Sequence, residues 1–103
     1  MITRNEAIKR ISQAKPLLRN EFGVREIGIY GSFARDEQSE SSDIDILVVL
    51  EKPDYGFYAG ALIYLEKLLG IKVDLIRKHS RMRESFLNRI EREIIYVLCD
   101  SGI

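Results

Sequence analysis

The sequence has few of the residues from which disulfide or zinc frameworks are built. Cys99 is the only cysteine of the 103 residues, and His79 is the only histidine. A disulfide within the chain needs two cysteines, and a structural zinc site needs about four cysteine or histidine ligands, so both frameworks are excluded. We expect Cys99 to be a small buried or interface side chain, and we assign His79 no metal or base role.

The sequence also lacks a long apolar run and an excess of charge of one sign. No stretch is long enough to cross a bilayer, and no apolar leader follows Met1. The 16 Lys and Arg residues balance 16 Asp and Glu residues. Because binding to DNA or a membrane surface through bulk charge needs a basic excess, we expect neither. The length predicts that residues 1–103 form a single domain, and a hydrophobic content of 46% is enough for a modest core. With these exclusions, we expect the domain to be cytoplasmic.

The balanced total conceals an uneven distribution of charge. Residues 36–54 contain seven acidic residues and one lysine, whereas residues 72–83 contain five basic residues and one aspartate. Residues 1–35 are also basic, with seven basic and three acidic residues. An acidic centre between basic segments suits a site that holds cations and polyanions together. Solvated faces give the same runs of charge, so this pattern does not identify a site by itself.

The periodicity of apolar residues predicts alternating helices and strands. Capping-box spacing at Thr3 and Glu6 begins a helix that Pro16 should kink or restart and Gly23 should end. Further helices are expected over residues 55–69 and from residue 80 or 84 to 92, and strands over 24–30, 43–50 and 71–77. Residues 94–98 form a last strand or more helix. This order predicts an α/β (α+β) domain, a small mixed β-sheet with helices packed against it.

Three aspartates lie on strands that are otherwise apolar. Asp43 and Asp45 are two residues apart, so their side chains point to the same face of the predicted strand. Asp74 would join them if its strand lies beside residues 43–50. Neighbouring carboxylates repel, and magnesium prefers such oxygen ligands, so three of them can hold the two metal ions of a phosphoryl-transfer site. Solvent-exposed acids, with Asp74 paired to Lys72 or Arg77, are the alternative.

A possible phosphate-binding turn precedes these acids. Gly31 would let the backbone approach a phosphate closely, and Ser32 supplies a hydroxyl. The backbone N–H groups of the following helical turn would point at an anion, and Arg35 would neutralise its charge. An ordinary turn capped by serine fits the same residues.

The two features together resemble the signature of a known superfamily. Glycine and serine at 31–32, ten residues and then D-x-D at 43–45 resemble the motif of the nucleotidyltransferases that include DNA polymerase beta. The short chain is similar to the minimal MNT-type nucleotidyltransferases, the antitoxins of HEPN toxins. The resemblance runs from the strand before Gly31 through Asp74 to the last helix. It implies a nucleotidyltransferase fold like the polymerase beta palm.

The resemblance implies a role for each matching position. The nucleotide-binding residues would be Gly31, Ser32, Arg35 and Ser42, and the catalytic and metal-binding residues would be Asp43, Asp45 and Asp74. Asp74 would complete one metal site and help to deprotonate the attacking hydroxyl. Asp36 stands where the family often has glycine, and it adds negative charge near the phosphates. Since aspartate tolerates a left-handed backbone, we expect the turn to survive.

The implied activity is transfer of AMP from ATP, with two Mg²⁺ ions, to a tyrosine of a HEPN RNase toxin. Two alternatives remain open. One is an antitoxin that blocks its toxin by binding alone, and the other is a nucleotidyltransferase for a small molecule or tRNA. The intact carboxylates weigh against the first, because clustered acids are costly to keep for shape. No group of residues identifies the base of the nucleotide.

Two further segments have surfaces that fit a partner. Residues 55–69 contain only two charged residues and carry two apolar stripes. One stripe is enough to pack on a sheet, so the second predicts contact with the toxin or a second copy, unless this helix is unusually deeply buried. The basic residues 77–83 fit a triphosphate, an acidic partner, RNA or only solvent. We expect Tyr30, before the turn, to be a packing residue.

Overall fold

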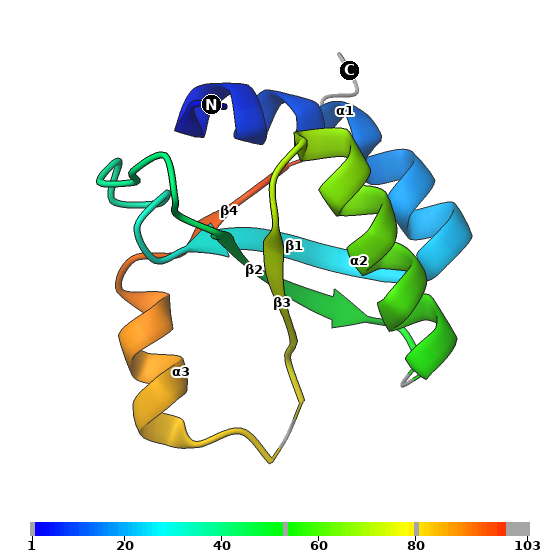
Figure 1. The fold of residues 1–103 in the computed structure, drawn as a ribbon. Helices are drawn as coiled ribbons and strands as arrows, with labels where there is room; N and C mark the ends of the chain where they lie inside the picture. The colour runs from blue at the N-terminus through cyan, green and yellow to red at the C-terminus, as the bar shows by residue number, and fades with distance from the viewer. Residues whose placement is uncertain (1, 53, 80, 99–103) are drawn as a thin grey trace.

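The computed structural model describes residues 2–52, 54–79 and 81–98 (Figure 1). Its elements are α1 (Arg4–Phe22), β1 (Val24–Tyr30), β2 (Ile44–Leu50), α2 (Tyr55–Leu69), β3 (Val73–Arg77), α3 (Glu84–Glu91) and β4 (Ile95–Tyr96). The strands form one sheet in the order β3-β2-β1-β4. β1 is antiparallel to β2 and β4, whereas β2 and β3 are parallel. The predicted small mixed sheet with helices against it is therefore confirmed.

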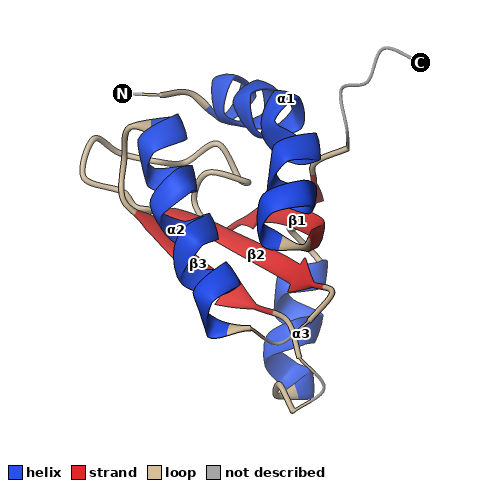
Figure 2. Ribbon diagram, turned by 90° about the vertical axis from the view of Figure 1, so that its right-hand side faces the viewer, coloured by secondary structure: helices blue, strands red, loops and turns tan. Residues whose placement is uncertain are grey.

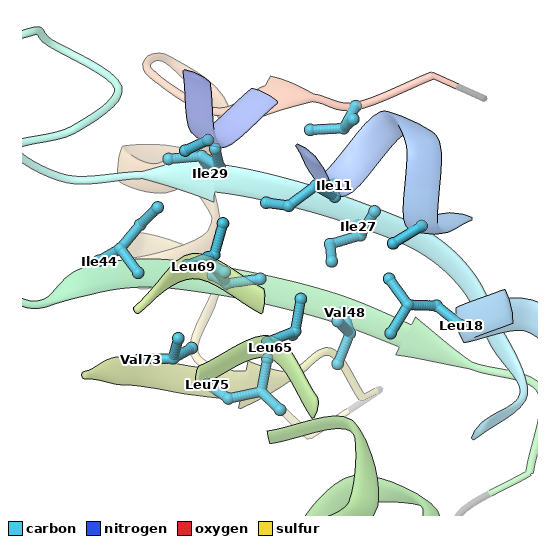
Figure 3. Close-up of a cluster of buried hydrophobic side chains, with 14 of the residues drawn as sticks. Ile11, Leu18, Ile27, Ile29, Ile44, Val48, Leu65, Leu69, Val73 and Leu75 are labelled. Atoms are coloured by element: carbon cyan, nitrogen blue, oxygen red, sulfur yellow. The ribbon is translucent and has the colours of Figure 1, made fainter. Parts of the chain in front are cut away.

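The helices cover the two faces of the sheet unequally. α1 and α2 lie side by side over one face, and α3 lies on the other side of the sheet (Figure 2). The main core fills the space between α1, α2 and the sheet, with side chains from both helices and from β1, β2 and β3 (Figure 3). A smaller cluster of Tyr30, Leu47 and Ile90 joins the sheet to α3.

Alternation along β2 decides which residues face which cluster. Ile44, Ile46 and Val48 are completely buried in the main core. Because side chains of a strand alternate between faces, Asp45 and Leu47 lie on the opposite face, which α3 covers. Burial of the apolar residues of β2 in the main core thus places the Asp45 carboxylate on the α3 side of the sheet.

The predicted ends of α1 are confirmed by capping contacts. The Thr3 side chain accepts a hydrogen bond from the Glu6 N–H at 3.1 Å. Gly23 has a left-handed backbone, with φ of 66°, and its N–H donates to the Arg19 carbonyl at 3.0 Å. These contacts satisfy backbone groups that the helix leaves unpaired at its two ends.

Pro16 does not restart the first helix, contrary to one of the two expectations. α1 continues through it without interruption. Pro16 is exposed, so water can reach the carbonyl that its missing N–H leaves unpaired. On the opposite side, Ala14 and Leu18 are buried and hold both halves of the helix against the core.

The other elements depart from the predictions mainly at their ends. β3 begins at Val73, two residues later than expected, and β4 is a short strand of Ile95–Tyr96 rather than more helix. α3 begins at Glu84; residue 80, the other expected start, and Cys99 lie outside the described residues. The exposed His79 accepts a hydrogen bond at Nδ1 from the Arg81 N–H, at 3.1 Å.

The second apolar stripe of α2 is largely used within the chain. Tyr58, Leu62, Tyr64 and Leu68 pack, partly buried, against the main core. Packing within the chain therefore accounts for most of the apolar surface of α2. Among its large hydrophobic side chains, Tyr55 and Ile63 are more than half exposed. Of the helices in the described ranges, none is long and apolar enough to cross a membrane.

Candidate active site

Two aspartates lie side by side on β2 and β3, near the starts of both strands. In the register of the parallel strands β2 and β3, Asp45 is opposite Asp74. On the other side of Asp45, antiparallel β1 places Tyr30. The expectation that residues 71–77 lie beside residues 43–50 is confirmed. Neighbouring residues in register point to the same face, so both carboxylates project toward the α3 side.

The surroundings of Asp45 disfavour its negative charge. Burial is the largest of the effects that together raise the pKa of Asp45 to about 6; the charge of Asp74, a hydrogen bond with Asp74 and the charges of Asp43 and Glu93 follow in that order. A carboxylate in such a position gains from a cation, which would offset the repulsion of its neighbours. The electrostatics therefore indicate a site for positive charge next to Asp45.

The Gly31 backbone lies directly against the Asp45 carboxylate. Gly31 has φ of 75°, and an added Cβ would lie 3.1 Å from Cγ of Asp45 and closer still to one of its oxygens. Only glycine meets both conditions without displacing the carboxylate. The sequence predicted close approach of a phosphate at this glycine, and the structure adds a close approach of the carboxylate.

A compact turn over residues 31–36 follows β1. The Arg35 N–H donates to the Gly31 carbonyl at 3.2 Å, and the Glu37 N–H donates to the Ser32 carbonyl at 2.8 Å. Phe33 is completely buried in the main core and anchors the turn. Asp36 has a left-handed backbone, with φ of 59°, so the expectation that aspartate preserves the turn is confirmed.

The Glu93 carboxylate contacts Gly31 and Arg35, two residues that we expected to bind phosphate. Its Oε2 atom accepts hydrogen bonds from the Gly31 N–H at 2.8 Å and from Arg35 Nη1 at 2.6 Å. Arg35 Nε also donates to Glu37 Oε1 at 2.6 Å. The hydrogen bond that Arg35 donates to Glu37 and the charge of Glu93 raise the pKa of Arg35. The donors of this turn are thus directed at a negatively charged group of the chain itself.

An open pocket of about 500 Å³ lies between the turn, the two aspartates and α3. Its walls are formed by Tyr30, Gly31, Ser32, Arg35, Asp45, Asp74, Ile76, Phe86, Arg89 and Glu93. Five of the seven residues predicted for the site therefore lie together. Ser42 and Asp43 do not line the pocket: the Ser42 hydroxyl accepts a hydrogen bond from the Ser39 N–H at 2.9 Å, and the exposed Asp43 precedes β2.

The number of carboxylates in the pocket is relevant to the metal that they would suit. Within the described ranges, no three His, Cys, Asp or Glu side chains converge on a point that could hold a metal ion. Magnesium differs from zinc in that one or two carboxylates suffice when substrate phosphates and water complete the shell. Asp45 and Asp74, with Asp43 two residues away from Asp45, fit that kind of site.

The sequence did not indicate the pocket residues of α3. Phe86 and Arg89 are three positions apart, so they share one face of the helix. The Arg89 guanidinium lies over the Phe86 ring, 5.6 Å from its centre. Ile90 is buried against Tyr30 and Leu47. Helical periodicity identifies this apolar face, but it does not tell which strands the face covers.

Tyr30 is buried at the base of the pocket, as its predicted packing role requires. It is 6% exposed and clusters with Leu47 and Ile90. Burial, followed by the charges of Asp45 and Asp74, raises the pKa of Tyr30, so its hydroxyl stays protonated.

Comparison with known proteins identifies the family of this chain. The nucleotidyltransferase domain family matches residues 11–98. The protein adenylyltransferase MntA of Thermococcus cleftensis is 42% identical over 98 residues, which cover 94% of this chain and 98% of that protein. A solved minimal nucleotidyltransferase is 27% identical, with a TM-score of 0.76 over 91% of this chain and 95% of that one.

A more distant structure has the same fold. It is a complex of a tri-AMPylated Shewanella oneidensis HEPN toxin with an MNT antitoxin, in which one chain is 20% identical to this protein with a TM-score of 0.61. The match covers 97% of this chain and 76% of that one. Taken with the glycine-serine turn beside paired aspartates, the comparisons show that the chain belongs to the nucleotidyltransferase domain family, among its minimal MNT-type members.

Proposed function

We propose that this protein is a magnesium-dependent adenylyltransferase that acts as an antitoxin in the cytoplasm. It would transfer AMP from ATP to a tyrosine hydroxyl of a HEPN-type RNase toxin and so neutralise the toxin. The observation that carries the proposal is the in-register pair of Asp45 and Asp74 beside the anion-binding turn at Gly31. The 42% identity to a protein adenylyltransferase across nearly the whole of both chains supports AMP as the transferred group.

The turn would hold the phosphates of ATP. The Gly31 N–H, now bonded to Glu93, is a donor that a phosphate oxygen can use in its place. The Ser32 hydroxyl lines the same pocket and supplies a second contact. These contacts fix the phosphates next to Asp45, whose carboxylate touches the glycine of the turn.

The paired aspartates would serve the transfer itself. Bound magnesium supplies positive charge that offsets the charge developing on the phosphates and activates the attacking hydroxyl. Asp45 and Asp74 would hold it, with Asp43 as a third oxygen donor. The tyrosine oxygen attacks the α-phosphorus, the bond to the bridging oxygen of pyrophosphate breaks, and pyrophosphate leaves. Asp74, which is exposed in the pocket wall, would accept the hydroxyl proton.

A second protein would provide the acceptor. Tyr30, the tyrosine in the pocket wall, is buried with a raised pKa and is held in the sheet opposite Asp45. The pocket is open to solvent, so a tyrosine on a partner surface can reach it. The fold similarity to a chain in the complex of an AMPylated HEPN toxin with an MNT antitoxin supports a HEPN partner.

The test is transfer of label from α-labelled ATP to the HEPN protein that co-purifies with this chain. Wild type should label a tyrosine in the presence of magnesium, and Asp45→Asn should abolish labelling. The matched control is Asp54→Asn, because Asp54 caps α2 outside the pocket. Absent labelling by wild type, or undiminished labelling by Asp45→Asn, would contradict the proposal. Neutralisation without labelling would favour an antitoxin that acts by binding, and labelled tRNA or small molecule would favour the other alternative.

A further inference from the structure

Two arginines line the catalytic pocket, and their electrostatic surroundings differ. Arg35 is paired with Glu37 and with Glu93, at 2.6 Å in each case. Arg89 has no carboxylate within ion-pairing distance among the residues that the structure describes. Because two carboxylates already offset the positive charge of Arg35, Arg89 is the pocket cation whose charge is available to an anionic ligand.

We propose that Arg89 binds the polyphosphate chain of the nucleotide and that Phe86 positions its guanidinium for this contact. This inference rests on the proposed function, in which ATP enters the same pocket. It assigns to α3 the phosphate-binding role that sequence reasoning gave to Arg35.

The charge of the pocket requires such a contact. Its other charged side chains are the carboxylates of Asp45, Asp74 and Glu93 and the paired guanidinium of Arg35. A triphosphate entering this pocket is repelled by the carboxylates that face it. A guanidinium offers several N–H donors in a planar fork that matches phosphate oxygens, so Arg89 offsets part of the repulsion where metal ions do not reach.

The packing of α3 determines where Arg89 lies. The adjacent residue, Ile90, is 2% exposed and is buried against Tyr30 and Leu47, which fixes the helix on the sheet. Phe86 packs against the same cluster. The Arg89 guanidinium rests over the Phe86 ring at 5.6 Å, an attractive arrangement that limits the motion of a long side chain. The charge of Arg89 also lowers the pKa of Tyr30 against the larger effects that raise it, in keeping with a position near the pocket base.

Arg89 also borders a second hollow. This hollow of about 450 Å³ is lined by Met82, Arg83, Ser85, Phe86 and Arg89. Phe86 and Arg89 belong to both linings, so these two residues lie between the hollows, and Arg89 borders the catalytic pocket directly.

The test is calorimetric titration of magnesium and ATP into the full chain, with each variant first checked by thermal unfolding. Arg89→Ala should raise the Kd of ATP by about tenfold or more, the value of one charge-assisted hydrogen bond. Arg89→Lys should recover part of the affinity, because lysine keeps the positive charge but lacks the planar set of N–H donors of a guanidinium. The matched control is Arg92→Ala at the exposed end of α3, outside the pocket, which should leave the Kd within about twofold.

Three further measurements separate phosphate binding from a structural effect. Magnesium tripolyphosphate, which has no nucleoside, should lose affinity for Arg89→Ala in parallel with ATP. Phe86→Leu keeps an apolar side chain in the smaller cluster and should weaken ATP binding less than Arg89→Ala does. In the double variant, Phe86→Leu should add little to the effect of Arg89→Ala, because a positioning residue acts through the arginine.

Each outcome bears on a different claim. If wild type binds ATP and Arg89→Ala binds it equally well, the role of Arg89 is wrong and the proposed function stands. If Arg35→Ala/Glu93→Gln, which removes a paired cation and anion together, loses more affinity than Arg89→Ala, Arg35 is the main phosphate contact and the inference is overturned. If wild type binds no ATP, the proposed function fails and the inference fails with it.

Discussion

Replacing Asp45 by asparagine should stabilise the metal-free protein while removing its activity. Burial and then the charge of Asp74 raise the pKa of Asp45 from 3.8 to about 6. Since one pKa unit corresponds to about 1.4 kcal/mol, the charged carboxylate costs at most about 3 kcal/mol of folding stability. Asp45 is only partly buried, so solvent screens much of this cost, and we expect a gain of about 1–2 kcal/mol.

The gain should depend on pH in a definite direction. The carboxyl group titrates near 3.8 in the unfolded chain and near 6 in the folded protein. Between these values the folded state binds more protons, so the stability of wild type falls as the pH rises through this window. Above the folded pKa the whole penalty is present, and below the unfolded pKa it is absent. Asp45→Asn should therefore exceed wild type in stability near neutral pH, and this advantage should shrink in acid.

Urea unfolding in EDTA, at a pH above and a pH below this window, measures the effect. The midpoint should shift while the slope with denaturant stays the same, because the exposed surface does not change. Glu40→Gln is the control, since Glu40 is an exposed loop residue. Equal stability of Asp45→Asn and wild type at neutral pH, or a gain that is as large in acid, would refute the reasoning.

Three further substitutions test the turn. Gly31→Ala should destabilise the fold by about 1–3 kcal/mol in chemical unfolding, because φ is 75° and the new Cβ would meet the Asp45 carboxylate; unchanged stability would contradict this geometry. Glu93→Gln should tighten ATP binding severalfold in calorimetry, because the competing anion on Gly31 and Arg35 is neutralised; weaker binding would show that Glu93 instead orients Arg35. Asp36→Gly should stabilise the protein by about 0.5–1 kcal/mol in thermal unfolding, since φ is 59°, and a loss would show that the Asp36 side chain supports the turn.

Local features of the sequence were sufficient for the fold and for part of the site. Thr3 and Gly23 mark helix ends through contacts with their own neighbours, so short motifs locate them. The pairing of Asp45 with Asp74 follows from strand alternation once the two strands are neighbours. These predictions rest on interactions between residues close in sequence or on a period of two, and both can be recognised in a single sequence.

The remaining site residues depend on contacts between distant segments. Glu93 meets Gly31 across 62 positions, and no periodicity marks a carboxylate that will turn toward a backbone amide. Arg89 lines the pocket only because α3 packs on the face of the sheet opposite to α1 and α2. Pro16 does not interrupt α1, because the packing of the helix against the core outweighs one unpaired carbonyl. Tertiary packing decides each of these cases.

Mass spectrometry of the HEPN partner after incubation with this protein, ATP and magnesium tests the central claim most directly. With wild type, tyrosine of the partner should carry AMP, and pyrophosphate should form in equal amount. With Asp45→Asn/Asp74→Asn, the partner should keep its unmodified mass, because both carboxylates beside the anion-binding turn are then neutral. AMP on the partner in the presence of the double variant, or an unmodified partner in the presence of wild type, would contradict the account.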